Sequence, residues 1–170
     1  MFTHLKVCSK VLLLACLLLG FVARSTAQDQ EWTNEMLQAT YMKFLAEGGY
    51  LPTIDADGDV QFKREGKTYY IPINAEDTEF FAVNLANIYD VTPENKTAIL
   101  ETCNYVTATT KVAKLQVIDD RKVWITAEIF VSHPEEGIKT FDRMLSSIDT
   151  ASNKFITKMR ELMGLDSKDD

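Results

Sequence analysis

The chain contains few of the residues on which disulfide frameworks and metal sites depend. Its 170 residues include three cysteines and two histidines. Cys8, Cys16 and His4 lie within the first 27 residues, which leaves only Cys103 and His133 in the rest. One cysteine cannot form an internal disulfide, and one histidine cannot build a zinc site of several histidines. A disulfide-rich fold and the common zinc motifs are therefore excluded for that part of the chain.

Motifs of nucleotide binding and nucleophilic catalysis are missing as well. The chain contains no G-x-S-x-G, no G-x-G-x-x-G, no phosphate-binding loop and no H-E-x-x-H. No pair of carboxylates stands out as the acid and base of a glycoside hydrolase. We therefore predict that the protein is not an enzyme and that it binds no cofactor.

One acidic run resembles a calcium loop at first sight. Asp55-Ala-Asp-Gly-Asp59 offers carboxylate oxygens, which calcium prefers. An EF-hand, however, needs glycine at position 6 and glutamate at position 12 of its loop, and position 12 here is Gly66. We interpret the run as a turn leading into a strand, with a weak calcium site as the alternative.

Basic residues are outnumbered by acidic ones. The 18 Lys and Arg stand against 25 Asp and Glu, a formal net charge of −7, and the first 27 residues hold no acidic residue. Nucleic acids and anionic membranes are bound mainly through Lys and Arg. We expect neither as a partner. The 46% of hydrophobic residues are ordinary for a globular protein with one core.

No apolar run reaches the roughly 20 residues of a membrane span. The run from Val11 to Ala23 follows a basic start and precedes Ser25 and Ala27, small residues at the −3 and −1 positions of a cleavage site. We predict that residues 1–27 are a signal peptide cleaved before Gln28, and that the protein is exported, to the periplasm or beyond. The alternative is lipidation of Cys16, because Leu13-Leu-Ala-Cys16 resembles a bacterial lipobox; without it we expect no stable membrane insertion.

Residues 28–165 are expected to form a single domain, followed by a polar tail at 166–170. Hydrophobic periodicity predicts the order αβββαββα, an α+β fold. Pro72 is expected to lie at an edge or outside the ladder, and Ser132 with Glu135 to form a capping box. Helices are expected at about 34–47, from Thr92-Pro93-Glu94 onward, and over about 29 residues after Ser132. Strands are expected at 59–63, 68–73, 79–89, 111–118 and 122–131. A helix is also possible at 79–89.

One strand predicts a binding surface. Val123, Ile125 and Ile129 alternate strictly, so they should face the helices while Trp124 and Phe130 point away. The same alternation places Tyr70 and Phe80 outward. Exposed aromatic side chains in a cluster typically mark a partner surface; the alternative is that a helix covers this face too. Glu128 would lie at a polar rim or pair with a cation such as Lys114.

Several different short motifs are distributed along most of the chain, from about residue 49 to 163. They are Gly49-Tyr-Leu-Pro-Thr-Ile54, Asp57-Gly-Asp-Val-Gln-Phe62, Glu65-Gly-Lys-Thr-Tyr-Tyr70, Glu79-Phe-Phe81 with Asn87-Ile-Tyr89, the strand at 111–119, and the long last helix with Phe141 and Phe155. This set resembles the YbjN-like family, the bacterial sensory transduction regulators, which share the fold of type III secretion chaperones. The resemblance implies helices packed mainly on one face of an antiparallel sheet, frequent dimerisation, and a binding or chaperone-like role without known catalysis.

The leading functional prediction is therefore a non-catalytic exported module that captures a protein partner, often as a homodimer. The alternative is a carrier or sensor of a small apolar ligand held between the long helix and the sheet. The sequence does not identify the partner, the ligand or the pathway.

Overall fold

The computed structural model describes residues 31–164. The predicted signal peptide, the lipidation alternative at Cys16 and the predicted tail at 166–170 lie outside the described residues. Residues 32–164 belong to one compact unit. None of the helices within residues 31–164 is both long enough and apolar enough to cross a membrane.

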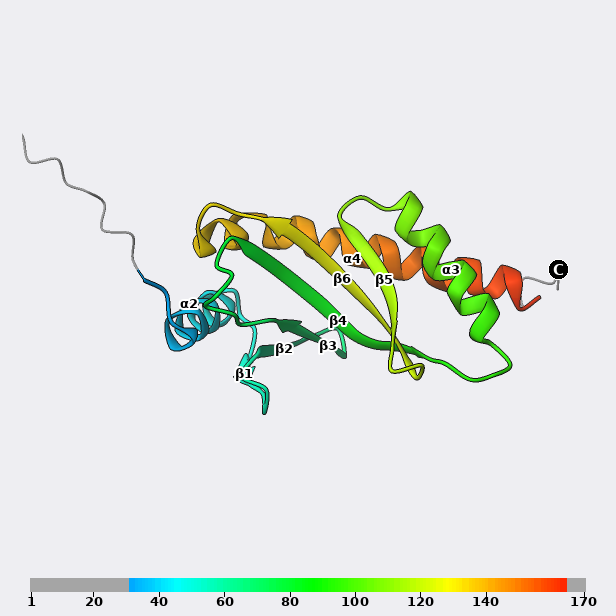
Figure 1. Cartoon of the computed structure of the whole chain (residues 1–170), viewed down its shortest axis with the longest axis horizontal. Helices are drawn as coiled ribbons and strands as arrows, with labels where there is room; N and C mark the ends of the chain where they lie inside the picture. Colours follow the sequence, from blue (N-terminus) through cyan, green and yellow to red (C-terminus); the bar gives the residue numbers. More distant parts are fainter. Residues whose placement is uncertain (1–30, 165–170) are drawn as a thin grey trace, which may run out of the picture. The chain divides into compact units, whose positions relative to one another are not determined.

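Six antiparallel strands form one sheet in the order β1-β2-β3-β4-β6-β5 (Figure 1). The three helices that the structure describes are interspersed among them along the chain. The elements are α2 (Asn34–Glu47), β1 (Thr53–Ile54), β2 (Val60–Arg64), β3 (Lys67–Ile71), β4 (Phe80–Asp90), α3 (Lys96–Thr109), β5 (Ala113–Ile118), β6 (Lys122–Phe130) and α4 (Pro134–Leu162).

The β2–β3 and β5–β6 hairpins and the long β4–β6 pair determine the register of the sheet. The β2–β3 turn consists of Glu65 and Gly66, whose φ values of 52° and 75° match a type I′ turn. The β4–β6 pair runs from Phe80 opposite Phe130 to Asp90 opposite Lys122. Its register shifts between Leu85 and Tyr89, where Asn87 has a φ of 55°. The shift is a β-bulge, which bends the strand locally.

The helices pack on one face of the sheet, with α4 running lengthwise along it (Figure 1). α4 packs on β4, β5 and β6. α2 contacts the N-terminal half of α4, where the ring centroids of Phe44 and Phe141 lie 5.1 Å apart. α3 meets its C-terminal half, where the Thr102 hydroxyl lies 3.3 Å from the Met159 sulfur. One element therefore connects both ends of the core.

The core lies between α4 and the inward-facing strand residues. Val83, Leu85, Val123, Ile125 and Ala127 are fully buried, as the alternation predicts. α4 contributes a stripe at 3,4 spacing: Phe141, Leu145, Ile148, Phe155 and Met159, all at most 4% exposed. Cys103, on the apolar stripe of α3, is buried, and burial raises the pKa of its thiol to about 11.

Close packing of α4 on β4 depends on Gly137. A Cβ atom built on this residue would lie 2.3 Å from the ring of Phe81. Real Cβ contacts do not occur at that distance, so the α4 backbone can approach Phe81 only because residue 137 has no side chain.

The predicted α+β class is confirmed, as are the three helices, the five longer strands, and the 29-residue length of α4. The region 79–89 is a strand, and β3 ends at Ile71, before Pro72. The structure adds β1, a strand of two residues.

Two predicted helix starts are wrong. The residue before α4 is His133, not Ser132, and Glu136 rather than Glu135 accepts a hydrogen bond, from the Ser132 backbone N–H at 2.9 Å. α3 begins at Lys96 rather than at Thr92-Pro93-Glu94. Before α3, the Thr92 backbone N–H donates a hydrogen bond to the Asn95 side-chain oxygen, which closes a turn.

Candidate functional site

Side chains that point away from the helices form what we name the open face of the sheet. On β6 these are Trp124, Thr126, Glu128 and Phe130, which alternate with the core residues. β4 contributes Phe80, Ala82, Asn84 and Ala86, β3 contributes Tyr70, and β5 contributes Lys114. All four residues predicted for a partner surface, Tyr70, Phe80, Trp124 and Phe130, lie on this face.

The first aromatic pair stacks across β4. The rings of Tyr70 and Trp124 have centroids 5.9 Å apart and planes inclined by 11°. β4 runs between β3 and β6, so the two rings meet across it. The Trp124 indole N–H donates to the Asn87 side-chain oxygen at 3.2 Å, so the β4 bulge holds the indole in place.

The second aromatic pair lies at the other end of β6. Phe80 and Phe130 are cross-strand partners, and their rings meet edge to face with centroids 6.1 Å apart. Phe80 is half-buried, but Phe130 is 87% exposed. A phenylalanine this exposed at the end of a central strand leaves most of its apolar surface in water.

Polar groups separate the two aromatic pairs. Asn84 lies opposite Thr126, and Ala82 lies opposite Glu128. The side-chain oxygens of Asn84 and Thr126 are buried without a hydrogen-bond partner among the described residues. Glu128 pairs with Lys114 at 2.5 Å, the cation named from the sequence. The centre of the open face therefore contains two buried polar groups without a partner, which is costly in free energy.

The sequence-predicted residues therefore form two pairs and not one continuous cluster. Sequence reasoning missed Asn84 and Asn87. The signal for Asn87 is weak: asparagine tolerates positive φ, but it does so in many turns as well as in bulges. The side-chain oxygen of Asn84 is buried because of neighbouring residues on β3 and β6. These neighbours are distant in the sequence, so no local pattern predicts the burial.

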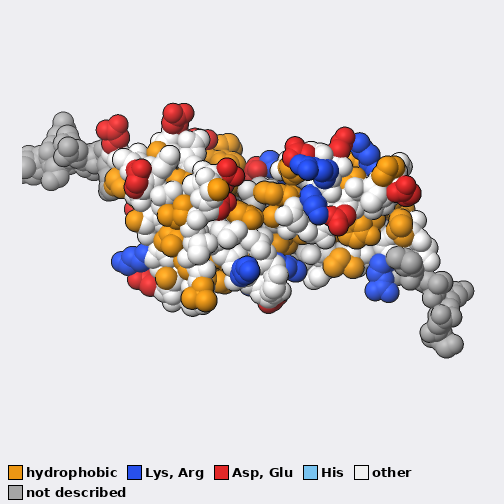
Figure 2. All heavy atoms as spheres, turned by 90° about the horizontal axis from the view of Figure 1, so that it is seen from below, with side chains coloured by type: hydrophobic (Ala, Val, Ile, Leu, Met, Phe, Trp, Pro, Cys, Tyr) orange, Lys and Arg blue, Asp and Glu red, His pale blue; other side chains and the backbone are white. Residues whose placement is uncertain are grey.

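Exposure alone would not single out this face. Leu51, Ile54, Leu100 and Ile156 are also substantially exposed. Figure 2 shows hydrophobic side chains reaching the surface in small groups among charged ones on one side of the molecule. Scattered apolar residues are normal on protein surfaces. The open face differs because its aromatic residues are paired across strands and flank unused polar groups.

Lys114 and Glu128 on the open face form an ion pair with each other. Among residues 31–164, no three His, Cys, Asp or Glu side chains gather closely enough to hold a metal ion.

The Asp55–Asp59 run forms the turn that we predicted. The Asp55 carboxylate accepts the N–H groups of Asp57 and Asp59, each at 3.0 Å. The Asp59 carboxylate accepts the Ile73 N–H at 2.9 Å, and burial raises its pKa.

The solved structures that resemble the chain include the following two. YbjN from E. coli, described as a candidate transcription regulator, shares 15% identity at a TM-score of 0.52, over 70% of this chain and 88% of that one. An uncharacterized protein from Methanothermobacter thermautotrophicus shares 16% identity at a TM-score of 0.49, over 77% and 99%. No protein-family model and no curated protein sequence matches. The likeness to the E. coli structure shows that the chain has a YbjN-like fold, as its motifs predicted.

Proposed function

We propose that the protein is a non-catalytic module that captures a protein partner on the open face of its sheet. The observation that carries this proposal is Phe130, which is 87% exposed and paired edge to face with Phe80. Large aromatic side chains are typical anchors at the centre of protein interfaces. Covering this pair would remove apolar area from water without any rearrangement of the fold.

The spacing of the two aromatic pairs determines the length of the partner segment that could cover both. Trp124 and Phe130 are six residues apart on one strand, which corresponds to about 20 Å. A partner helix of about 13 residues, or an extended segment of about six, has that length. It would carry an apolar side chain at each end, opposite the two aromatic pairs. A second copy of this chain could present the same features, because its own open face has them.

The remaining features of the proposal come from the sequence. The predicted signal peptide supports an exported site of action, and the resemblance to YbjN-like proteins supports a homodimer. YbjN itself is described as a candidate transcription regulator. The acidic charge of this chain favours protein over nucleic acid as its partner.

The double variant Trp124→Ser with Phe130→Ser tests the proposal. We expect a folded protein of near-normal thermal stability that has lost self-association in analytical ultracentrifugation, or has lost the proteins that the wild type captures from its native extract. Leu51→Ser with Ile156→Ser is the matched control, because Leu51 and Ile156 are 90% and 53% exposed and do not lie on the open face.

Two results would contradict the proposal. If the double variant is unfolded, the aromatic residues are part of the core and the face assignment is inverted. If it is folded and keeps the association and capture of the wild type, the partner surface lies elsewhere on the molecule.

A further inference from the structure

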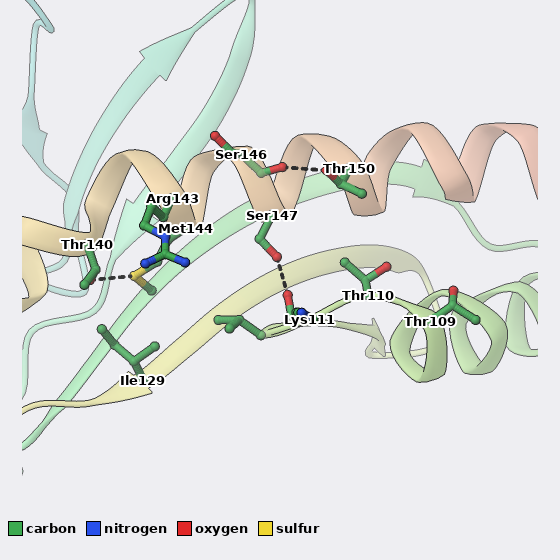
Figure 3. Close-up of a pocket in the computed structure, with 11 residues that line it drawn as sticks. Thr109, Thr110, Lys111, Ile129, Thr140, Arg143, Met144, Ser146, Ser147 and Thr150 are labelled. Carbon is green, nitrogen blue, oxygen red and sulfur yellow. Dashed lines mark hydrogen bonds between the residues drawn. The ribbon is translucent and has the colours of Figure 1, made fainter.

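A cavity of about 590 Å³ lies on the helix side of the sheet, away from the open face (Figure 3). Its walls are the α3–β5 loop (residues 109–112), the end of β6 at Ile129, and α4 from Thr140 to Thr150. Its volume is within the range of small-molecule sites in proteins.

The cavity exists because β5 is shorter than its neighbour. β5 begins at Ala113, which pairs with Ala127, so Ile129 continues β6 beyond the end of β5. α4 covers the gap from one side. Ile129 and the buried Met144 supply an apolar floor.

The loop that forms one wall is held in a strained conformation. The Ala113 N–H donates to the Lys111 carbonyl at 2.8 Å, which closes a three-residue turn around Val112. Val112 has a φ of 69°, a value that β-branched residues rarely adopt. The Ser147 hydroxyl donates to the same Lys111 carbonyl, and the Lys154 ammonium donates to the Thr109 carbonyl at 2.5 Å. α4 therefore fixes the loop at the edge of the cavity, and strain of this kind concentrates at binding sites.

The charge of the cavity is opposite to that of the chain. Lys111 and Arg143 line it, and none of its lining residues is acidic, although the whole chain carries a net charge of −7. Neither cation takes part in an ion pair within residues 31–164. In Figure 3 the Arg143 side chain extends from α4 into the space between the helix and Ile129.

Most hydroxyl groups on the walls have no hydrogen left for an anionic group. Those of Thr140, Ser146 and Thr150 already donate to carbonyls of α4 itself. The Thr110 hydroxyl is buried and has no partner among the described residues, so it can still donate.

We propose that this cavity binds a small amphiphile with one anionic head group, of which a medium-chain carboxylate is the simplest example. Arg143 and Lys111 would hold the head group, with the Thr110 hydroxyl as a further donor, since charged donors bind carboxylates most strongly. The apolar chain would lie over Ile129 and Met144. The sequence suggested a purely apolar ligand between the long helix and the sheet as an alternative function. The two cations favour a charged head group instead.

Octanoate is the probe for the test, and 1-octanol is its uncharged counterpart. Octanoate titrated into ¹⁵N-labelled protein should shift the backbone amide signals of Lys111 and Ser147, and 1-octanol should bind at least about tenfold more weakly, which corresponds to one lost charge-assisted hydrogen bond. Arg143→Gln should weaken octanoate binding by about the same factor and leave 1-octanol binding unchanged. Arg143→Lys should restore part of the affinity.

Lys63→Gln is the matched control, because Lys63 is exposed on β2 and does not line the cavity. Arg143 is exposed as well, so both variants are expected to fold, which thermal melting verifies. The proposal is overturned if octanoate does not bind, if it shifts only open-face signals such as Trp124, if 1-octanol binds equally well, or if Arg143→Gln and Lys63→Gln have the same effect.

Discussion

Gly137 has a structural role that its position in the first turns of a helix does not reveal. Glycine normally destabilises a helix interior by about 1 kcal/mol relative to alanine. Here a Cβ atom would lie 2.3 Å from the Phe81 ring. Phe81 is buried, so its ring cannot move aside without disturbing other core side chains.

We therefore expect Gly137→Ala to destabilise the protein. Overpacking a core typically costs about 1–3 kcal/mol, which should outweigh the gain in helix propensity. Urea unfolding measures the change. Asn153→Ala, at an exposed position of α4, is the control and should be neutral or stabilising. A stabilised Gly137→Ala variant would show that α4 does not approach β4 as described.

Tyr41 predicts a stability loss at high pH. Burial raises the pKa of its phenol to about 12, with the Glu135 carboxylate as a further cause. In the unfolded chain the phenol ionises near pH 10. The folded state thus holds the proton more tightly, and stability is unaffected below pH 10 but falls as the pH rises from 10 to 12.

At pH 11 this single group should lower the free energy of unfolding by about 1.4 kcal/mol relative to pH 8. The measurement is urea unfolding of the wild type and Tyr41→Phe at both pH values, because the variant lacks the ionisable group. The loss between pH 8 and 11 should be smaller in the variant by that amount. Equal losses would mean that the Tyr41 phenol is accessible to water.

At the residue scale, the sequence predicts what alternation alone determines. Trp124 and Phe130 could be assigned to the face opposite Ile125 because a strand has a period of two. Gly137 could not be understood in this way, because its cause is the Phe81 ring on another element. The positive φ of Val112 also runs against the residue's own preference, so only its surroundings impose it.

Among the elements, α4 contributes most to the core. Its residue Phe141 is 1% exposed and contacts the rings of Phe44, Tyr50 and Phe62, which belong to α2, the following loop and β2. One side chain therefore connects three separate segments.

Phe141→Ala should cost about 3–5 kcal/mol, because it leaves a large cavity among aromatic rings that cannot collapse into it. The free energy of unfolding in urea gives the value. Ile156→Ala, on the same helix but 53% exposed, should cost much less. A loss below about 1 kcal/mol for Phe141→Ala would contradict this packing.

Element length decided which parts of the fold were predictable. Apolar residues at 3,4 spacing identified α4, and strict alternation identified β6. β1 was missed because two residues, Thr53 and Ile54, are too few to show any period. The starts of α3 and α4 were misplaced by a few residues, because Thr92 and Ser132 both lie beside other residues that can form a turn or cap.

At the scale of the whole molecule, the sheet depends on its last helix. Without α4 the inward faces of β4 and β6, including Phe81 and Ile125, would be exposed to water. α2 packs on β2 and α4, and α3 packs on β5 and α4, at the two ends of the core. The two ends of the core are therefore joined only through the sheet and α4.

We accordingly expect a fragment of residues 31–133 not to fold. Its circular dichroism should lack a cooperative thermal transition, and the dye 8-anilinonaphthalene-1-sulfonate should report exposed apolar surface. Adding residues 134–164 as a separate peptide should restore a transition if the helix is the missing part. A cooperative transition in the fragment alone would show that the sheet is stable without α4.

The order of the elements, with α4 after all six strands, has a consequence for biosynthesis. A ribosome synthesises the strands before the helix that covers them, so their apolar face remains uncovered until α4 has emerged. Contacts between segments far apart in the chain slow folding, and uncovered strands are prone to aggregate. The nascent protein should therefore remain unfolded, and in need of protection by chaperones, until α4 is available to pack on the sheet.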